Sequence, residues 1–335
     1  MASIDLDVSA KYYRLRRILR PWLYNLTLVA ICVAMLAPVF GTLVISLKRQ
    51  ADVESRPPVL FPCNTPATTF DITACRFVLE GYLRILEPQA DPSALFGLDL
   101  EGSMVTTYLP NTMVYAVVSS LLVTTYAGMA GYAFSRFRFR LRRALMISIL
   151  AITGVPLLTN LIALYQVGVS VRRAASTLSM ALTGEVASPL LIATVDRTFL
   201  ILVYVGFFLP FSIWVVKSFF DTIPHELEEA SFIDGCSPVS SLWRIIVPLA
   251  TPGLTSVFLL SFVGVWNEFI AEYLLVSSNA LKTAMFGLYD FISQFVISYQ
   301  VLAAACILLA MPVVILFLFA RPVFFRAMME GALKG

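Results

Sequence analysis

Charged residues are scarce in this sequence of 335 residues. Only 13% of the residues are Asp, Glu, Lys or Arg, whereas 59% are hydrophobic, and the mean hydropathy is +0.84. A soluble protein of this size carries about twice that share of charge. The composition therefore excludes a soluble globular fold and predicts an all-α protein that crosses a lipid bilayer several times.

Groups that metal centres, nucleotide sites and nucleic-acid interfaces need are also rare. The chain has one histidine, His225, and five scattered cysteines, which form no set with the spacing of metal ligands. It has no glycine-rich loop followed by Lys and Ser or Thr, so ATP binding by that motif is excluded. A net charge of +3, spread over several loops, gives no reason to expect nucleic acid. These absences predict a non-catalytic membrane subunit that binds no cofactor itself.

The N-terminal part predicts a first membrane span that begins in the cytoplasm. Residues 1–21 are polar and include several Lys and Arg residues, and an apolar run from residue 22 to 45 follows. The run exceeds the roughly 20 residues that cross the hydrocarbon layer and is too long for a signal peptide. We assign 22–47 to an uncleaved span with the N-terminus inside.

The next segment, 48–108, is predicted to be extracytoplasmic. It contains six prolines, and its acidic residues outnumber its basic ones, so it cannot form a span. In an oxidising compartment Cys63 and Cys75 could form a disulfide. The other three cysteines fall in spans or on the cytoplasmic side and are expected to stay reduced.

Residues 109–335 are predicted to hold five further spans, which makes six in all. The expected ranges are 109–134, 144–167, 199–219, 253–276 and 295–319. Five arginines between positions 136 and 143, with no acidic residue among them, mark a short cytoplasmic turn after the second span. Basic residues near the C-terminus place that end in the cytoplasm as well.

Two of these spans have features that need neighbouring helices. In the second, Ala127, Gly128 and Gly131 form a small face suited to close helix contact. The third contains Pro156 and Asn160, which are tolerated where adjacent helices satisfy the backbone. The connection 168–197 is expected outside, although it contains three arginines, so we expect a short interfacial helix at 171–182.

A stretch of mixed charge at 224–248 lies between the fourth and fifth predicted spans. Pro224 is expected to begin a helix and Gly235 to end it. Ser237 and Pro238 would begin a second helix, which Pro248 would end. The corner is rich in acid, so a cytoplasmic partner with a basic rim would be attracted to it.

The same stretch contains more apolar surface than an ordinary solvated loop, which is the simpler interpretation. This surface indicates that a partner covers the corner. The residues concerned are Leu227, Ala230, Phe232, Ile233, Leu242, Trp243 and Ile245.

These residues match a known motif. Glu229, Ala230 and Ser231, followed by Gly235 and then by Ile245, Val247 and Pro248, resemble the EAA motif of ABC importer permeases. The motif loop covers 220–248. Ser231 replaces the second alanine and Val247 the usual leucine, and both departures are mild.

The resemblance extends through most of the chain after Leu109. The sequences GYAFSRFRFR at the end of the second span, WNEF at 266–269 and GALKG at 331–335 look like carbohydrate-uptake permeases of the maltose-transporter type. This family implies the type I ABC importer permease fold in the cytoplasmic (inner) membrane. The segments 48–108 and 168–197 depart from the usual pattern, which puts the usual docking of a binding protein in doubt.

The resemblance also implies partners and site residues. The partners are a second permease subunit, a pair of ATP-binding subunits that bind ATP and Mg, and an extracytoplasmic sugar-binding protein. The corner would be the coupling helix that fits a cleft of the ATPase subunit. Glu229 would face a basic residue there, and Gly235 would allow the corner. The residues implied in coupling are Leu227, Glu229, Ala230, Ser231, Phe232, Gly235, Ile245 and Pro248.

The substrate path has weaker signals. Asn267 and Glu268 lie in the predicted fifth span, where polar groups are costly and therefore candidates for function. Trp266 and Tyr289 could stack on sugar rings, as could Tyr115 and Tyr204. The alternatives are that the polar groups bond to a neighbouring helix or lie at the membrane surface, and that the aromatic residues are interface anchors.

Two other classes of function remain open on the residues alone. A secondary transporter or channel would need membrane-embedded charges for ion coupling or a repeat of the span pattern, and neither is clear. A membrane scaffold that recruits a cytoplasmic partner is compatible with the corner. Co-purification with an ATPase would distinguish an importer subunit from both.

Overall fold

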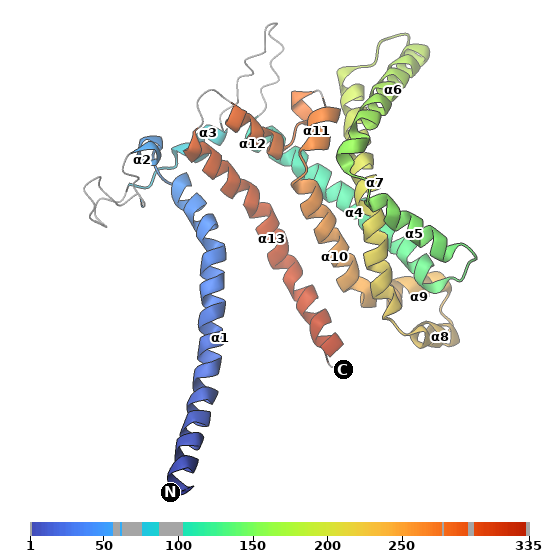
Figure 1. The fold of residues 1–335 in the computed structure, drawn as a ribbon. Coiled ribbons are helices and arrows are strands. Elements are labelled where there is room, and N and C mark those ends of the chain that lie inside the picture. Colours follow the sequence, from blue (N-terminus) through green and yellow to red (C-terminus); the bar gives the residue numbers. More distant parts are fainter. Residues whose placement is uncertain are drawn as a thin grey trace. The chain divides into compact units, whose positions relative to one another are not determined.

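The computed structural model describes residues 2–55, 61, 76–86, 103–276, 278–293 and 298–332. All regular elements in these ranges are helices, which confirms the all-α prediction (Figure 1). Cys63 and Cys75 lie outside the described residues. The elements are α1 (Ala2–Ser46), α2 (Gln50–Glu54), α3 (Glu80–Leu86), η2 (Met104–Tyr108), α4 (Leu109–Arg136), α5 (Arg142–Thr153), α6 (Leu157–Thr183), α7 (Pro189–Asp221), α8 (His225–Ile233), α9 (Pro238–Ser241), η3 (Leu242–Ile246), α10 (Val247–Trp266), α11 (Ile270–Leu275), η4 (Asn279–Leu281), α12 (Ala284–Ser293) and α13 (Tyr299–Ala332).

The chain is a multi-pass membrane protein. Among the described residues, five helical stretches are long and apolar enough to cross a membrane, and a sixth span results if α5 and α6 form one bent span. This agrees with the six predicted crossings. The five stretches are Pro21–Ser46, Met104–Arg136, Pro189–Asp221, Pro238–Trp266 and Tyr299–Pro322.

The predicted third span is broken. α5 and α6 are bent by 93° relative to one another, and Pro156 occupies the N-cap position of α6 in an extended conformation. Proline cannot donate to the helix before it and disfavours a helical residue ahead of it, so the break falls here. α6 then runs without interruption to Thr183, so the separate interfacial helix expected at 171–182 is wrong.

The chain forms two compact units. The first consists of Met1–Arg84 and Ser298–Ile307. In it the Ser46 Oγ lies 2.9 Å from the Tyr82 hydroxyl, and Gln50 Oε1 accepts a hydrogen bond from the backbone N–H of Gln300 at 3.2 Å. Residues 21–40 of α1 are exposed throughout, as an apolar helix surrounded by lipid would be.

The second unit, Ile85–Ile297 with Leu308–Gly335, has its core where α4, α7 and α10 pack together. A Cβ atom on Gly131 would lie 3.1 Å from the backbone nitrogen of Lys217 in α7. One on Gly128 would lie 3.2 Å from the Leu254 side chain in α10, and Ala127 is fully buried. The small face predicted for the second span is therefore confirmed.

The predicted fifth span extends too far at its C-terminal end. α10 ends at Trp266, and Asn267 turns the chain by donating from both its backbone N–H and its Nδ2 to the carbonyl of Val263. The short helix α11 follows. The polar residues Asn267, Glu268 and Glu272 therefore lie beyond the membrane-spanning helix rather than within it.

Candidate functional site

The corner at 224–248 has the predicted helix, glycine and helix. Pro224 is the N-cap of α8 rather than its first residue. Gly235 has a φ of +83°, which residues with a Cβ disfavour. The N–H of Gly235 bonds to Phe232 O and that of Cys236 to Ser231 O, the two bonds of a Schellman C-cap. Ser237 then caps α9 by accepting from the Ser240 N–H at 3.2 Å.

The second helix of the corner does not end at Pro248, so that expectation is wrong. α9 continues through the π-helical turn η3 directly into α10. The Val247 N–H bonds to Leu242 O, five residues back. This wider turn accommodates Pro248, which has no N–H and whose ring would collide with a regular preceding turn. The corner is thus continuous with the span that ends at Trp266.

One face of the corner exposes apolar side chains. Glu229 and Ala230 are exposed beside them. The exposed apolar side chains come from both α8 and the second helix, on either side of the glycine turn. The exposed fractions lie between 43% and 86% for Leu227, Phe232, Ile233, Val239 and Trp243.

Other residues of the corner are buried or partly buried rather than exposed. Ser231 is buried, and its Oγ lies 2.7 Å from both Ser241 Oγ and Glu228 O. Ile245 and Leu242 are partly buried and pack against the core of α4, α7 and α10. Ser231 therefore joins the two helices of the corner, and Leu242 and Ile245 attach the corner to the core.

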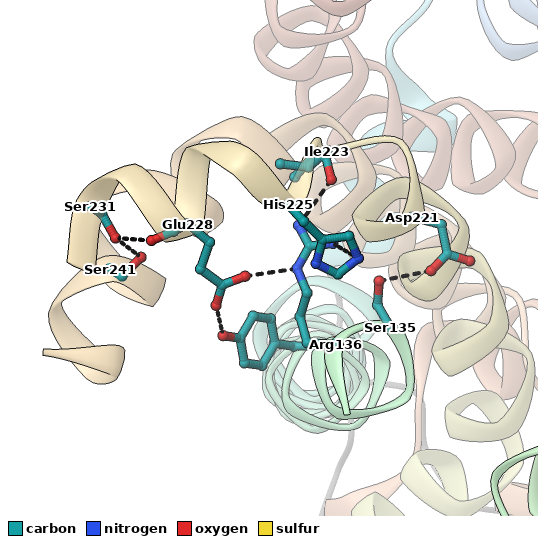
Figure 2. Close-up of polar contacts among 9 residues, drawn as sticks. Ser135, Arg136, Asp221, Ile223, His225, Glu228, Ser231 and Ser241 are labelled. Carbon is teal, nitrogen blue, oxygen red and sulfur yellow. Dashed lines mark hydrogen bonds and ion pairs between the residues drawn. The ribbon is translucent and has the colours of Figure 1, made fainter. Parts of the chain in front are cut away.

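A buried ion pair, which the sequence reasoning missed, holds α8 against α4. Arg136 Nε lies 2.9 Å from Glu228 Oε2, without the alignment of a well-formed hydrogen bond, and the side chains are only 4% and 10% exposed. Tyr132 donates to the other carboxylate oxygen. Figure 2 shows Arg136 and Glu228 directed toward one another. Helical spacing was the available signal, since Glu228 and the buried Ser231 are three residues apart and share a face.

Glu229, the next residue, takes no part in this buried ion pair. It lines a polar hollow of about 580 Å³ together with Arg136, Arg138 and Arg142. Asp221, also in its wall, accepts from Ser135 Oγ at 2.7 Å and is paired with Lys217. The corner therefore exposes apolar side chains and also brings a carboxylate and guanidinium groups together in one hollow.

The predicted substrate-path residues near Trp266 are engaged within the protein. Glu268 accepts from the Tyr204 hydroxyl at 3.0 Å, and its other oxygen accepts from the N–H groups of Ile270 and Ala271 at 2.9 Å. It therefore caps α11. Trp266 is buried and stacked on Phe262, with ring centroids 5.5 Å apart.

The tyrosines divide into buried and exposed groups. Tyr115 and Tyr204 are buried and meet edge to face, so neither is free to stack on a sugar or to anchor at a membrane surface. Tyr289 is exposed, and its ring centroid lies 5.1 Å from that of Phe269 and 6.1 Å from that of Tyr273. The structure thus separates Tyr289 from the Trp266 stack.

Two of the arginines that conflicted with the predicted topology, Arg172 and Arg197, belong to a polar network near Trp266, at the C-terminal end of α10. Arg172 pairs with Asp196 at 2.5 Å and donates to Leu275 O. Arg197 donates to Asn111 Oδ1 at 3.1 Å, while Asn111 Nδ2 donates to the carbonyls of Ala280 and Lys282. The arginines therefore hold the segment after α11 to α4, α6 and α7.

Glu272 is a second buried acid near Trp266, besides Asp196. It accepts from the N–H and the hydroxyl of Thr283. Burial raises the pKa of Glu272 to about 7, the bonds from Thr283 oppose that rise, and neighbouring Glu268 adds to it. Its carboxyl group is thus held where protonation is easy near neutral pH.

The chain belongs to the family of binding-protein-dependent transport system inner membrane components, whose model matches residues 120–330. It is an ABC transporter permease of the multi-pass type. It is 31% identical over 258 residues to the maltodextrin transport system permease protein MdxG of Bacillus subtilis, covering 72% of this chain and 85% of that protein. It is 28% identical over 300 residues to the sulfoquinovosyl glycerol transport system permease protein SmoH of Agrobacterium fabrum, covering 90% and 89% of the two chains.

The fold is also that of a solved transporter. A crystal structure of a bacterial ABC transporter involved in alginate import superposes with a TM-score of 0.64 at 19% identity, covering 93% of this chain and 98% of that one. This likeness confirms the predicted importer permease fold.

Proposed function

We propose that this chain is one permease subunit of an ATP-driven sugar importer. The carbohydrate-related names of its relatives support the substrate class. A second permease subunit would complete the translocation path, and an extracytoplasmic binding protein would deliver the sugar. Both termini would lie in the cytoplasm, and ATP and Mg would bind to a pair of separate ATPase subunits.

The observation that carries this proposal is the apolar face of the corner, exposed beside Glu229. Leu227, Ala230 and Phe232 would supply the contact area on the ATPase subunit, and Glu229 would fix the orientation against a basic residue. Closure of the ATPase pair would then move the corner and turn the permease pair from inward-facing to outward-facing. Such a shift requires contacts that differ between the two states, because equal contacts would move no equilibrium.

The sugar path is proposed at the opposite end of α10 (Figure 1). Asn267 and Tyr289 keep exposed side chains there. Trp266 is buried, and both oxygens of Glu268 are occupied, so these two would shape the path without touching the sugar. The proposal thus keeps two of the four candidate residues as direct contacts.

Co-purification tests the function as a whole. The tagged full-length chain is expected to bring down an ATPase whose hydrolysis rises when sugar-loaded binding protein is added. If no ATPase accompanies the chain under conditions that preserve the membrane complex, the importer assignment is wrong. A stand-alone transporter or a scaffold would then be favoured.

The exposed face is tested by changing Leu227→Asp together with Phe232→Asp. Apolar anchors at an interface contribute about 2 kcal/mol or more each, so ATPase co-purification should fall at least thirty-fold. The melting temperature in detergent should change little, because both side chains are exposed. The matched control is Leu227→Met with Phe232→Leu, which keeps apolar volume; equal loss in the control would contradict the docking role.

A further inference from the structure

Two consecutive glutamates of α8 face opposite environments. Glu228 is buried against α4, whereas Glu229 is exposed, because successive helical residues point about 100° apart. Resting on the function proposed above, we propose that Glu228, Arg136 and Tyr132 form a joint that transmits displacement of α8 to α4. In this inference Glu228 and Arg136 are positioning residues for coupling, while docking is left to the exposed face.

Arg136 connects the end of α4 to three points around the start of α8 (Figure 2). Its Nε lies 2.9 Å from Glu228 Oε2, and its Nη2 donates to Ile223 O at 3.0 Å. Its Nη1 lies 3.4 Å from His225 Nε2; a guanidinium only donates, so that nitrogen must be the acceptor. A single side chain thus fixes the last turn before α8 and the first turns of α8.

Tyr132 binds the second oxygen of the Glu228 carboxylate. It lies one helical turn before Arg136 on α4, and its hydroxyl donates to Glu228 Oε1. Its ring meets Phe220 of α7 edge to face, with centroids 5.8 Å apart. Both oxygens of Glu228 are therefore bound by one face of α4, in a direction that the packing of Tyr132 fixes.

The backbone at both ends of α8 explains why such a joint would be needed. Pro224 precedes the helix in an extended conformation, and Gly235 follows it with a positive φ. A short helix between two bends could pivot when a partner displaces it, and the displacement would then not reach α4. The buried contacts to α4, with the Ser231 to Ser241 bond to α9, prevent that pivot.

A purely apolar contact would hold α8 as firmly, since a buried ion pair loses much of its attraction to desolvation. What the polar contacts add is direction, because the bonds from the Tyr132 hydroxyl to Glu228 and from Arg136 Nη2 to Ile223 O are strong in only a narrow range of orientations. Joining α8 to α4 in a fixed orientation is what transmission requires. The exposed Arg140, four residues beyond Arg136, has the same charge but no ion pair or hydrogen bond among the described residues and does not line the Glu229 hollow, so it supplies a control.

The test uses the assembled transporter in proteoliposomes, with sugar uptake and ATP hydrolysis measured together. Glu228→Gln and Arg136→Gln are expected to retain ATPase co-purification and to lower uptake per ATP hydrolysed at least ten-fold. Tyr132→Phe keeps the ring packing and removes only the hydroxyl, so a smaller loss of two- to five-fold is expected. Arg140→Gln should leave the ratio unchanged.

The outcomes separate this inference from its alternatives. A merely structural pair predicts a lower yield of complex with uptake per ATP unchanged in what assembles, and that result overturns the proposal. If Glu228→Gln or Arg136→Gln fails to assemble, two other variants test the proposal. They are Tyr132→Phe and the charge swap that combines Glu228→Arg with Arg136→Glu. Normal coupling in Tyr132→Phe together with no recovery in the swap also overturns it. Absence of any ATPase with the unaltered chain overturns the proposed function itself.

Discussion

The two ends of α10 use polar and apolar groups in opposite ways. At the corner, one carboxylate is buried in an ion pair while apolar side chains remain exposed. At the Trp266 end, Glu268, Asn111 and Arg172 are all bonded within the chain. The first end has apolar surface left to bury, whereas these three polar side chains at the second end already have partners.

This difference predicts that mutations at the corner affect binding of a partner, whereas mutations near Trp266 affect the stability of the fold. Exposed apolar surface gains free energy only when a partner covers it, so changes there should alter assembly and leave the fold intact. Buried polar partners are costly to separate, since the group left behind has no water to replace the lost bond. Changes at the Trp266 end should therefore reduce stability first.

The largest effect on stability is expected from Asp196→Ala. It leaves Arg172 without its counter-charge, and because that side chain is 22% exposed the cost should be about 3 kcal/mol, at the low end for buried pairs. Reversible unfolding in mixed detergent measures it. Arg84→Ala is the control, since the Arg84 and Glu80 side chains are 57% and 50% exposed and a helical surface pair contributes about 0.5 kcal/mol. Similar losses in both variants would contradict the comparison.

The next effect is a pH dependence from Glu272. Its pKa in the folded chain is raised to about 7, so the folded state retains a proton that the unfolded state has lost. Stability should be highest below the ordinary carboxyl pKa and fall by on the order of 3 kcal/mol as pH rises to about 7.

Glu272→Gln removes this titration, so its melting temperature should vary less between pH 5 and pH 8 than that of the unaltered chain. Glu268 and Lys282 are the charged neighbours that act on this carboxyl group, and both remain in the variant. Glu185→Gln, at an exposed position, is the control and should leave the pH profile unchanged. An identical profile in Glu272→Gln would show that this carboxyl group does not titrate as stated.

The smallest effect is expected at the corner itself, from Gly235→Ala. A Cβ at Gly235 would meet no atom within 4 Å, so the cost is only that of a left-handed backbone, about 1 kcal/mol. Thermal unfolding should show a smaller loss for Gly235→Asn, because asparagine tolerates this conformation better. A loss of stability as large as that of Asp196→Ala would mean that the corner stabilises the fold as much as the Asp196–Arg172 ion pair does.

Local chemistry predicted much of the corner and little of its packing. Gly235 as a stop and Ser237 as a cap follow from backbone preferences, and both are confirmed. Pro248 was misplaced because a π-helical turn accommodates it, and no local pattern in the sequence announces that turn. Glu228 was passed over because its partner, Arg136, is distant in sequence.

The other end shows the same limit. Asn267 and Glu268 were noticed because they fall within the predicted fifth span, where polar groups are costly, but their roles as caps depend on where α10 ends. Arg172 and Arg197 conflicted with the topology only while Asp196 and Asn111 were unknown as their neighbours. Pairing of that kind joins residues from different helices, which residue spacing within one helix cannot express.

The sequence alone determined the class of molecule: a chain this apolar must satisfy its backbone internally in lipid, and helices do so within a single segment. It also determined the glycine stop and the serine cap of the corner, because Gly235 and Ser237 act through local backbone geometry. The tertiary structure alone decided which of the adjacent glutamates, Glu228 or Glu229, is buried. That choice depends on the approach of α4 to α8, and a contact between distant segments is fixed only when the helices pack.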